Sequence, residues 1–375
     1  MATEIEKLEN GTLAIETHDK KLSSEDSQKS LISKYGLLLL NIASSAVGTI
    51  SGPILLRLYF IHGGSKKWIS SWLETAGFPL LIIPITILYM RQGKPGLKFL
   101  ASPFLVICSI LLGIILGLNN FMYAHGLSYL PVSTSSLLLS TQLIFTAFFA
   151  LIIVRQKFTP YSINAVVLMT LGSILLGLSK SGDRPFGVTN AQYLLGFILT
   201  IGSACLAGFI LPCTEAMYAK ASQVITFSIV LQLQFWMACS ATVFSSIGML
   251  INNDFSAIPR EAGTYELGAA KYYMVLVSSA VVWQMMFVGT MGIIFCSSSL
   301  FAGIINATLL PLTEIVAVIV FHEKFNGEKG MALALGIWGF TSYFYGSYRD
   351  SKKQTQTETD GSYKETKKEI DTNLN

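Results

Sequence analysis

Charged side chains are scarce in this sequence. They make up 13% of its 375 residues, whereas soluble domains carry roughly 25%. Hydrophobic residues make up 52%, and the mean hydropathy is +0.55. A chain of this size and composition is too apolar for a soluble globule, so we expect it to fold in a lipid bilayer.

Sequence motifs of enzymes and of metal sites are also missing. There is no phosphate-binding Gly-Lys-Ser/Thr loop, no His-Glu-x-x-His zinc motif and no Gly-x-Ser-x-Gly nucleophile turn. The cysteines fall within apolar stretches and lack the spacing of metal ligands: Cys108, Cys205, Cys213, Cys239 and Cys296. We therefore predict no enzymatic activity, no cofactor, no metal site and no transport driven by the chain's own ATP hydrolysis.

Lysine and arginine are sparse inside the apolar stretches. This scarcity disfavours a carrier of nucleotide sugars or phosphorylated sugars, whose anionic groups need basic partners. The basic residues instead gather in two charged tails, 1–34 and 349–375, and in loops predicted on the same side, which the positive-inside rule places in the cytoplasm. Both tails are rich in Ser and Thr and are predicted to be disordered. The first lacks the apolar core of a cleavable signal peptide.

Long apolar runs, by contrast, are plentiful. A helix needs roughly 20 apolar residues to cross about 30 Å of hydrocarbon, and ten stretches approach or exceed this length. Because the runs are continuous and do not alternate, they predict helices and not the strands of a membrane barrel. They are residues 35–60, 68–90, 103–126, 131–154, 160–179, 191–218, 224–251, 271–296, 298–321 and 330–348. The predicted fold class is an all-α membrane protein with ten transmembrane helices.

Part of the chain is repeated. Residues 140–158, STQLIFTAFFALIIVRQKF, align without gaps on residues 307–325, ATLLPLTEIVAVIVFHEKF, and about a third of the positions are identical. Both segments end in a charged cap that begins at Arg155 in one copy and at His322 in the other. A gapless match of this kind indicates a duplicated membrane unit.

The duplication divides the predicted helices into two units, 35–179 and 191–348. Five helices per unit, an odd number, turn the second unit upside down relative to the first, which is the inverted-repeat plan of secondary transporters. The first helices of the two units support this division at a constant spacing: Ser44, Pro53 and Tyr59 correspond to Ser203, Pro212 and Tyr218. Pro53 and Pro212 are also candidate helix breaks along a substrate pathway.

Two segments carry a resemblance to a known family. They are GGSKKWISSWLETAGFPLLIIP at 63–84 and LSYLPVSTSSLLLSTQLIFTAFFA at 127–150. Together with the duplicated five-helix plan, they make the chain similar to the plant purine permeases of the drug/metabolite transporter superfamily, from about residue 35 to 348. The resemblance implies import of adenine and related purines, including cytokinins, driven by a proton gradient at the plasma membrane.

Side-chain amides supply candidate substrate contacts. An amide presents an acceptor and two donors in one plane, the geometry that recognises adenine in nucleic acids. Buried amides can equally hold helices together by hydrogen bonds between them. Counting about 1.5 Å per residue places six amides at the predicted midplane or somewhat outside it: Asn119, Asn120, Gln142, Gln232, Gln284 and Asn306.

Aromatic rings supply the stacking surface that a planar heterocycle needs. Tyr123 shares a helix face with Asn119, because the two lie four positions apart, and Trp72 is a candidate stacking wall. We accordingly predict a substrate site made of six residues: Asn119, Tyr123, Gln142, Gln232, Gln284 and Trp72.

Two carboxyl groups inside the predicted spans are candidates for proton coupling. Glu74 and Glu314 both fall in the predicted outer half of the membrane. An acidic group there can take up a proton from outside and release it inward. Charged side chains inside a membrane are energetically costly, so a functional role of this kind is expected for them. The alternative is an ion pair with Arg57 that only holds helices together.

The sequence thus predicts a proton-coupled importer of uncharged purine-type heterocycles that works by alternating access. Its predicted partners are a small-molecule purine, protons and the lipid bilayer, without nucleic acid. Its predicted location is the plasma membrane, with both termini in the cytoplasm. Two alternatives stay open: a drug/metabolite-type carrier of another heterocycle, such as an alkaloid or a vitamin-like compound, and a transporter-derived membrane sensor.

Overall fold

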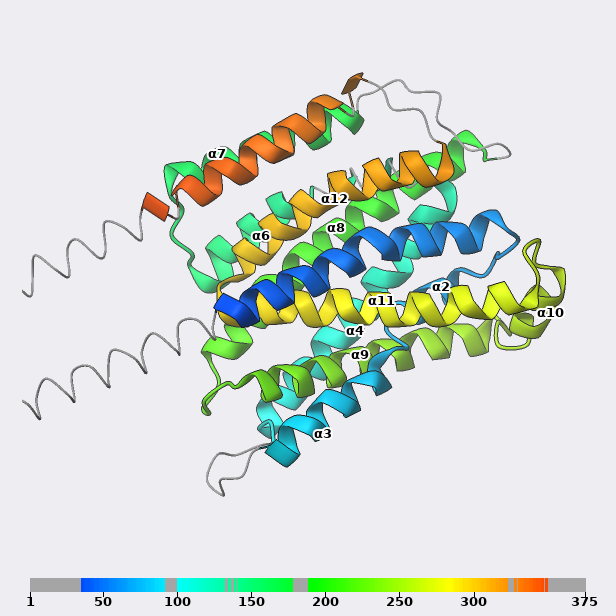
Figure 1. Cartoon of the computed structure of the whole chain (residues 1–375), viewed down its shortest axis with the longest axis horizontal. Coiled ribbons are helices and arrows are strands. Elements are labelled where there is room, and N and C mark those ends of the chain that lie inside the picture. The colour runs from blue at the N-terminus through cyan, green and yellow to red at the C-terminus, as the bar shows by residue number, and fades with distance from the viewer. Residues whose placement is uncertain are drawn as a thin grey trace, which may run out of the picture.

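Every regular element in the described part of the chain is helical (Figure 1). The computed structural model describes residues 35–91, 100–131, 134–135, 138–139, 141–177, 188–322, 327–328, 330–346 and 348–349. The predicted tails, 1–34 and 349–375, lie outside these ranges apart from Arg349. The all-helical fold class is therefore confirmed.

The helices follow one another with short connections. The first helix is Tyr35–Ile61. It is followed by α2 (Lys67–Leu73), the 3-10 turn η1 (Phe78–Leu81), α3 (Ile82–Arg91), α4 (Pro103–Tyr129), α6 (Gln142–Phe149) with its π-helical continuation η2 (Ala150–Val154), α7 (Pro160–Gly177), α8 (Asn190–Ala219), α9 (Phe227–Ile251), α10 (Ala257–Thr264), α11 (Ala269–Cys296) and α12 (Ser299–Phe321). Residues 330–346 form a last helix.

Seven helical segments in the described residues are long and apolar enough to cross a membrane. They are Tyr35–Ile61, Lys67–Arg91, Pro103–Tyr129, Asn190–Ala219, Phe227–Ile251, Ala269–Cys296 and Ser299–Phe321. The predicted spans 131–154 and 160–179 correspond to the shorter apolar helices Gln142–Val154 and Pro160–Gly172, and the span 330–348 to the last helix. The chain is an integral membrane protein, and ten spans remain a prediction.

The second predicted span is interrupted in its middle. α2 ends at Leu73, residues 74–77 form turns, and the chain resumes as η1 and α3. Gly77 lies so close to α11 that an added Cβ would collide with the carbonyl oxygen of Ala280. Pro79 has no backbone N–H with which to extend α2. The break leaves Glu74 at the end of α2, facing the interior of the bundle.

The candidate breaks at the two prolines were wrong. The first helix continues without interruption through Pro53, and α8 continues through Pro212. Membrane helices tolerate proline because neighbouring groups and small local adjustments satisfy the freed carbonyl. The two prolines therefore do not mark helix breaks along a substrate pathway.

α4 lies centrally and packs most extensively on α8 and α9 (Figure 1). Glycines bring these backbones close together. A Cβ added at Gly113 would collide with α9 at Met237, and one added at Gly126 would collide with Thr200 of α8. Small residues at such contacts are the usual means by which membrane helices approach one another.

A buried carboxyl group joins the elements at the end of the bundle that carries α10. Glu261 is 7% exposed. It accepts hydrogen bonds from the hydroxyls of Tyr59 and Tyr272, at 2.8 and 3.1 Å. It also accepts from the backbone N–H and the hydroxyl of Ser65, each at 2.9 Å. These bonds connect α10 to the first helix, to the loop before α2 and to α11.

Replacing Glu261 with alanine is expected to lower the melting temperature of the detergent-purified protein by several degrees. The change leaves the hydroxyls of Tyr59 and Tyr272, both fully buried, without their acceptor, at about 1–3 kcal/mol for each. The control is Glu266→Ala, because the Glu266 side chain is 67% exposed and pairs with His62 at 3.0 Å. Exposed pairs of this kind contribute about 0–1 kcal/mol. Equal melting temperatures for the two variants would contradict the role given to Glu261.

Candidate functional site

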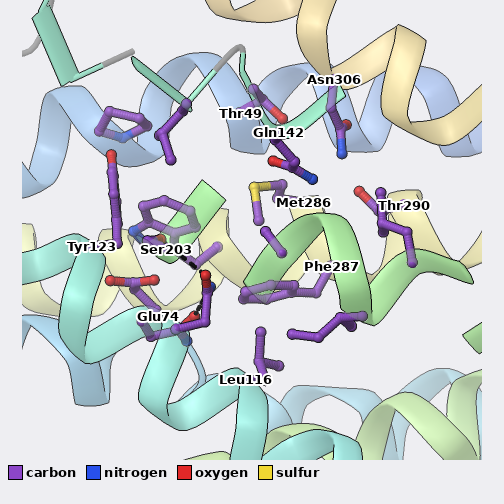
Figure 2. Close-up of a pocket in the computed structure, with 18 of the residues that line it drawn as sticks. Thr49, Glu74, Leu116, Tyr123, Gln142, Ser203, Met286, Phe287, Thr290 and Asn306 are labelled. Atoms are coloured by element: carbon purple, nitrogen blue, oxygen red, sulfur yellow. Dashed lines mark hydrogen bonds between the residues drawn. The ribbon is translucent and has the colours of Figure 1, made fainter. Parts of the chain in front are cut away.

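A cavity of about 110 Å³ lies inside the bundle, between the first helix, α2, α4, α6, α8, α11 and α12 (Figure 2). This volume is several times the roughly 10–15 Å³ that one water molecule requires. Its wall is mostly apolar with a few polar groups, which is typical of small-molecule sites. The polar side chains that line it are Thr49, Glu74, Asn119, Asn120, Tyr123, Gln142, Ser203, Thr290 and Asn306.

One side of the cavity is acidic. Glu74 is 1% exposed, and its Oε1 atom has no hydrogen-bond partner among the described residues. The amide of Asn120, oriented so that its surroundings are satisfied, donates to Glu74 Oε2 at 3.3 Å. Next to this pair, Asn119 Oδ1 accepts a hydrogen bond from Ser203 Oγ at 2.9 Å. The helix break thus places a carboxyl group among amides.

Among the side chains that the structure describes, no ion pair joins Glu74 to Arg57. The ion pairs between described side chains, Lys66 with Asp254 at 3.1 Å and His62 with Glu266 at 3.0 Å, lie outside the cavity. A charge buried in a membrane protein without a partner is costly.

The contacts of the turn that follows Glu74 involve uncharged groups. On the α9 side, Thr242 Oγ1 donates to Thr75 Oγ1 at 3.0 Å. On the α11 side, Gly77 packs against Ala280. On the α4 side, Tyr123 is the titratable group that interacts electrostatically with Glu74. Glu74 is therefore the principal acidic group of the cavity wall in the described residues.

The opposite side of the cavity is polar but uncharged. Figure 2 shows Thr49, Gln142, Thr290 and Asn306 together on this side, away from Glu74, Tyr123 and Ser203. Ser45 Oγ donates to Asn306 Oδ1 at 3.3 Å and lies 3.2 Å from Thr290 Oγ1. The two sides therefore present different hydrogen-bonding groups.

An apolar part of the cavity wall comes from a single helix. It consists of Trp283, Met286 and Phe287, all from α11. The rings of Trp283 and Phe287 are 6.3 Å apart and inclined by 30°. Tyr123 meets Trp283 edge to face, with ring centres 5.7 Å apart. Aromatic faces of this kind are suited to stacking on a planar ring.

Three of the predicted site residues meet in the cavity. Asn119 and Tyr123 project from α4, and Gln142 from the start of α6. Asn119 and Tyr123 lie four positions apart, so one helix face brings both to the wall. These three remain the candidate substrate contacts.

The structure does not bring the other three to the cavity wall. Gln232 Oε1 accepts from the backbone N–H of Ala101, at 3.2 Å, just before α4. Trp72 Nε1 donates to Ser246 Oγ at 3.0 Å and lines an outer groove. Gln284, 3% exposed, packs against the helix break, because a Cβ at Gly77 would lie 3.1 Å from its Cβ.

The second candidate for proton coupling lies on α12. The described side chains do not include that of Glu314, although its backbone is helical. Its predicted role stays untested for that reason.

Sequence reasoning missed the wall formed by α11. Five pairs of cavity residues are separated by the same 167 positions: Leu116 and Trp283, Asn119 and Met286, Asn120 and Phe287, Tyr123 and Thr290, and Leu139 and Asn306. The segments 140–158 and 307–325 differ by 167 positions as well. Extending that spacing back to Asn119 would have pointed to Met286 and Phe287.

The sequence also matches a known family over most of its length. A family model described as purine nucleobase transmembrane transport covers residues 36–353. This chain is a member of the purine permease family. Purine permease 3 of Arabidopsis thaliana is 44% identical over 330 residues, which are 86% of this chain and 94% of the relative. Purine permease 2 of the same plant is 42% identical over 343 residues, 87% and 96% of the two chains.

A solved crystal structure supports the fold independently. It superimposes with a TM-score of 0.54 at 14% identity and covers 82% of this chain and 95% of the other. The relatives of this purine permease are named as transporters and not as enzymes. The described residues contain no group of three or more His, Cys, Asp or Glu placed to hold a metal ion.

Proposed function

We propose that this purine permease imports adenine and related purines, including cytokinins. The observation that carries the proposal is the cavity itself, in which amide and carboxyl groups surround an aromatic wall. Such a site suits a flat, uncharged heterocycle with donors and acceptors on its edges. The names of the relatives, purine permeases of Arabidopsis thaliana, support the same substrate class.

The proposed import is coupled to protons through Glu74, with Glu314 as the second candidate. Glu74 lines the substrate cavity and has an unpartnered carboxyl oxygen. Proton binding at this position is therefore linked to events in the cavity. A carboxyl group that alternately binds and releases a proton on the two sides of the membrane would provide the coupling.

The proposed mechanism is alternating access by two inverted five-helix units, 35–179 and 191–348. Arg155 and His322, which correspond in the repeated segments, both end their helices with left-handed backbone angles, φ 52° in each case. Non-glycine residues seldom adopt this conformation. Its recurrence at corresponding positions supports a common origin of the two segments.

Contacts between helices support the same division. Thr313 Oγ1 donates to the carbonyl oxygen of Thr49 in the first helix, at 3.1 Å. At the corresponding place, Gly208 of α8 packs on Thr146, since an added Cβ would lie 2.9 Å from the Thr146 nitrogen. Thr49 and Gly208 are separated by the same number of positions as Ser44 and Ser203, so they correspond in the two units. Rocking of such units around a central site is the usual transport cycle of inverted repeats.

The plasma membrane, with both termini cytoplasmic, is the proposed setting.

The test of the site is uptake of labelled adenine by cells expressing wild type or Gln142→Ala. We expect the variant to raise the apparent KM about tenfold, because a hydrogen bond to the ring is lost, with a smaller effect on the maximal rate. Gln232→Ala is the matched control and should leave KM unchanged, since Gln232 bonds to Ala101 outside the cavity.

Surface expression of all three proteins is measured in the same cells. An unchanged KM in Gln142→Ala would remove Gln142 from the site. No adenine uptake by wild type, with uptake of an alkaloid or vitamin-like compound, would replace the proposed substrate. No uptake of any of them would favour a sensor.

A further inference from the structure

The uncharged side of the cavity contains a hydrogen-bond chain that fixes one amide. Ser45 is fully buried and Thr290 is 5% exposed. Ser45 has a single hydroxyl proton, which it donates to Asn306 Oδ1 at 3.3 Å. The Thr290 hydroxyl, 3.2 Å away, must then act as donor to Ser45. Each hydrogen bond is thus donated in the same direction, from Thr290 to Ser45 and from Ser45 to Asn306.

This series of hydrogen bonds leaves the amide nitrogen of Asn306 available to a ligand in the cavity. The oxygen of Asn306 is occupied by Ser45, and no hydrogen bond of Nδ2 is found among the described residues. Figure 2 shows the nitrogen end of Asn306 pointing into the cavity. An amide NH₂ group is purely a donor. The uncharged side of the cavity therefore offers a donor to the ligand, whereas the side of Glu74 offers an oxygen.

Packing alone does not require an amide at this position. Leu139 also lines the cavity, and it precedes Asn306 by the same 167 positions that relate Asn119 to Met286. An apolar side chain thus occupies the corresponding place in the first unit. Because the first unit has Leu139 where the second has Asn306, the two corresponding parts of the cavity wall differ in polarity.

We propose that Asn306 is a specificity-determining residue, which donates a hydrogen bond to an acceptor on the edge of the heterocycle that faces away from Glu74. Ser45 is its positioning residue. The preferred ligand is then a planar ring with an acceptor, such as a ring nitrogen, opposite the edge that meets the carboxyl group. This inference rests on the proposed purine transport and adds the orientation of the purine in the site.

The test is a cycle of variants and ligands. Inhibition of labelled adenine uptake is measured with unlabelled adenine and with 1-deaza-, 3-deaza- and 7-deazaadenine, each of which replaces one ring nitrogen by a C–H group. Wild type, Asn306→Ala and Ser45→Ala are compared, with Asn164→Ala as control because exposed Asn164 bonds to Ser342 away from the cavity, at 2.9 Å. If the amide and a ring nitrogen interact, the loss of affinity from changing both differs from the sum of the losses from changing each alone.

We expect Asn306→Ala to lower the affinity for adenine about tenfold. The same variant should leave the affinity for one of the three deaza analogues unchanged. Ser45→Ala should lower the affinity for adenine less than Asn306→Ala does, because the freed amide can still turn its nitrogen to the ring. Equal losses for adenine and all three analogues would overturn the inference while leaving purine transport intact. Absence of adenine uptake by wild type would overturn both. Surface expression and the retained affinity for the analogue exclude misfolding as the cause.

Discussion

Glu74→Gln is expected to abolish uphill accumulation of adenine and to flatten the pH dependence of uptake between external pH 5 and 8. Glutamine has nearly the same shape and can accept the hydrogen bond that Asn120 donates to Glu74, at 3.3 Å. It cannot bind and release a proton, however. Wild type should lose accumulation when a proton uncoupler is added, whereas the variant should equilibrate substrate with or without the uncoupler.

A second carboxyl group provides the control for this experiment. Glu215 Oε2 accepts the backbone N–H of Ser299 at 2.7 Å, at the start of α12, where a helix N-terminus favours negative charge. An amide oxygen can take over that hydrogen bond, so Glu215→Gln should keep accumulation and pH dependence. If Glu74→Gln behaves like wild type while Glu215→Gln loses both properties, Glu74 is not the proton site.

The helices themselves could be predicted because lipid imposes one rule on the whole chain. Each span must be apolar and must satisfy its backbone internally, so hydropathy located seven long helices to within a few residues. The break at residues 74–77 could not be found in this way. Hydropathy continues across it, and the close approach of Gly77 to Ala280 at this place involves α11, a helix far along the chain.

The site was predicted less completely because depth along a helix does not say which way a side chain points. Counting residues placed Gln142 and Gln232 at similar depth, yet the structure directs Gln142 into the cavity and Gln232 toward Ala101. Helix rotation is decided by packing against neighbours. Asn119 and Tyr123 were located together because both their depth and their shared face are properties of one helix.

Gly289→Ala is expected to remove most adenine uptake and to lower the melting temperature of the purified protein. Gly289 of α11 faces the first helix so closely that an added Cβ would collide with the backbone of Asn41 and Ser45. In the same interface Gly48 lies against the backbone of Met286. Because two backbones cannot yield as a side chain does, the helices must separate, at about 1–3 kcal/mol for overpacking.

The loss of uptake follows from what this interface carries. Ser45 holds Asn306, and Met286 lines the cavity, so moving the first helix away from α11 disturbs both sides of the site. Gly263→Ala is the matched control, because a Cβ at Gly263 has no atom within 4 Å. Alanine is also preferred to glycine in a helix by about 1 kcal/mol, so this variant should match wild type or melt slightly higher. If Gly289→Ala transported and melted like Gly263→Ala, the close contact between the first helix and α11 would not govern the cavity.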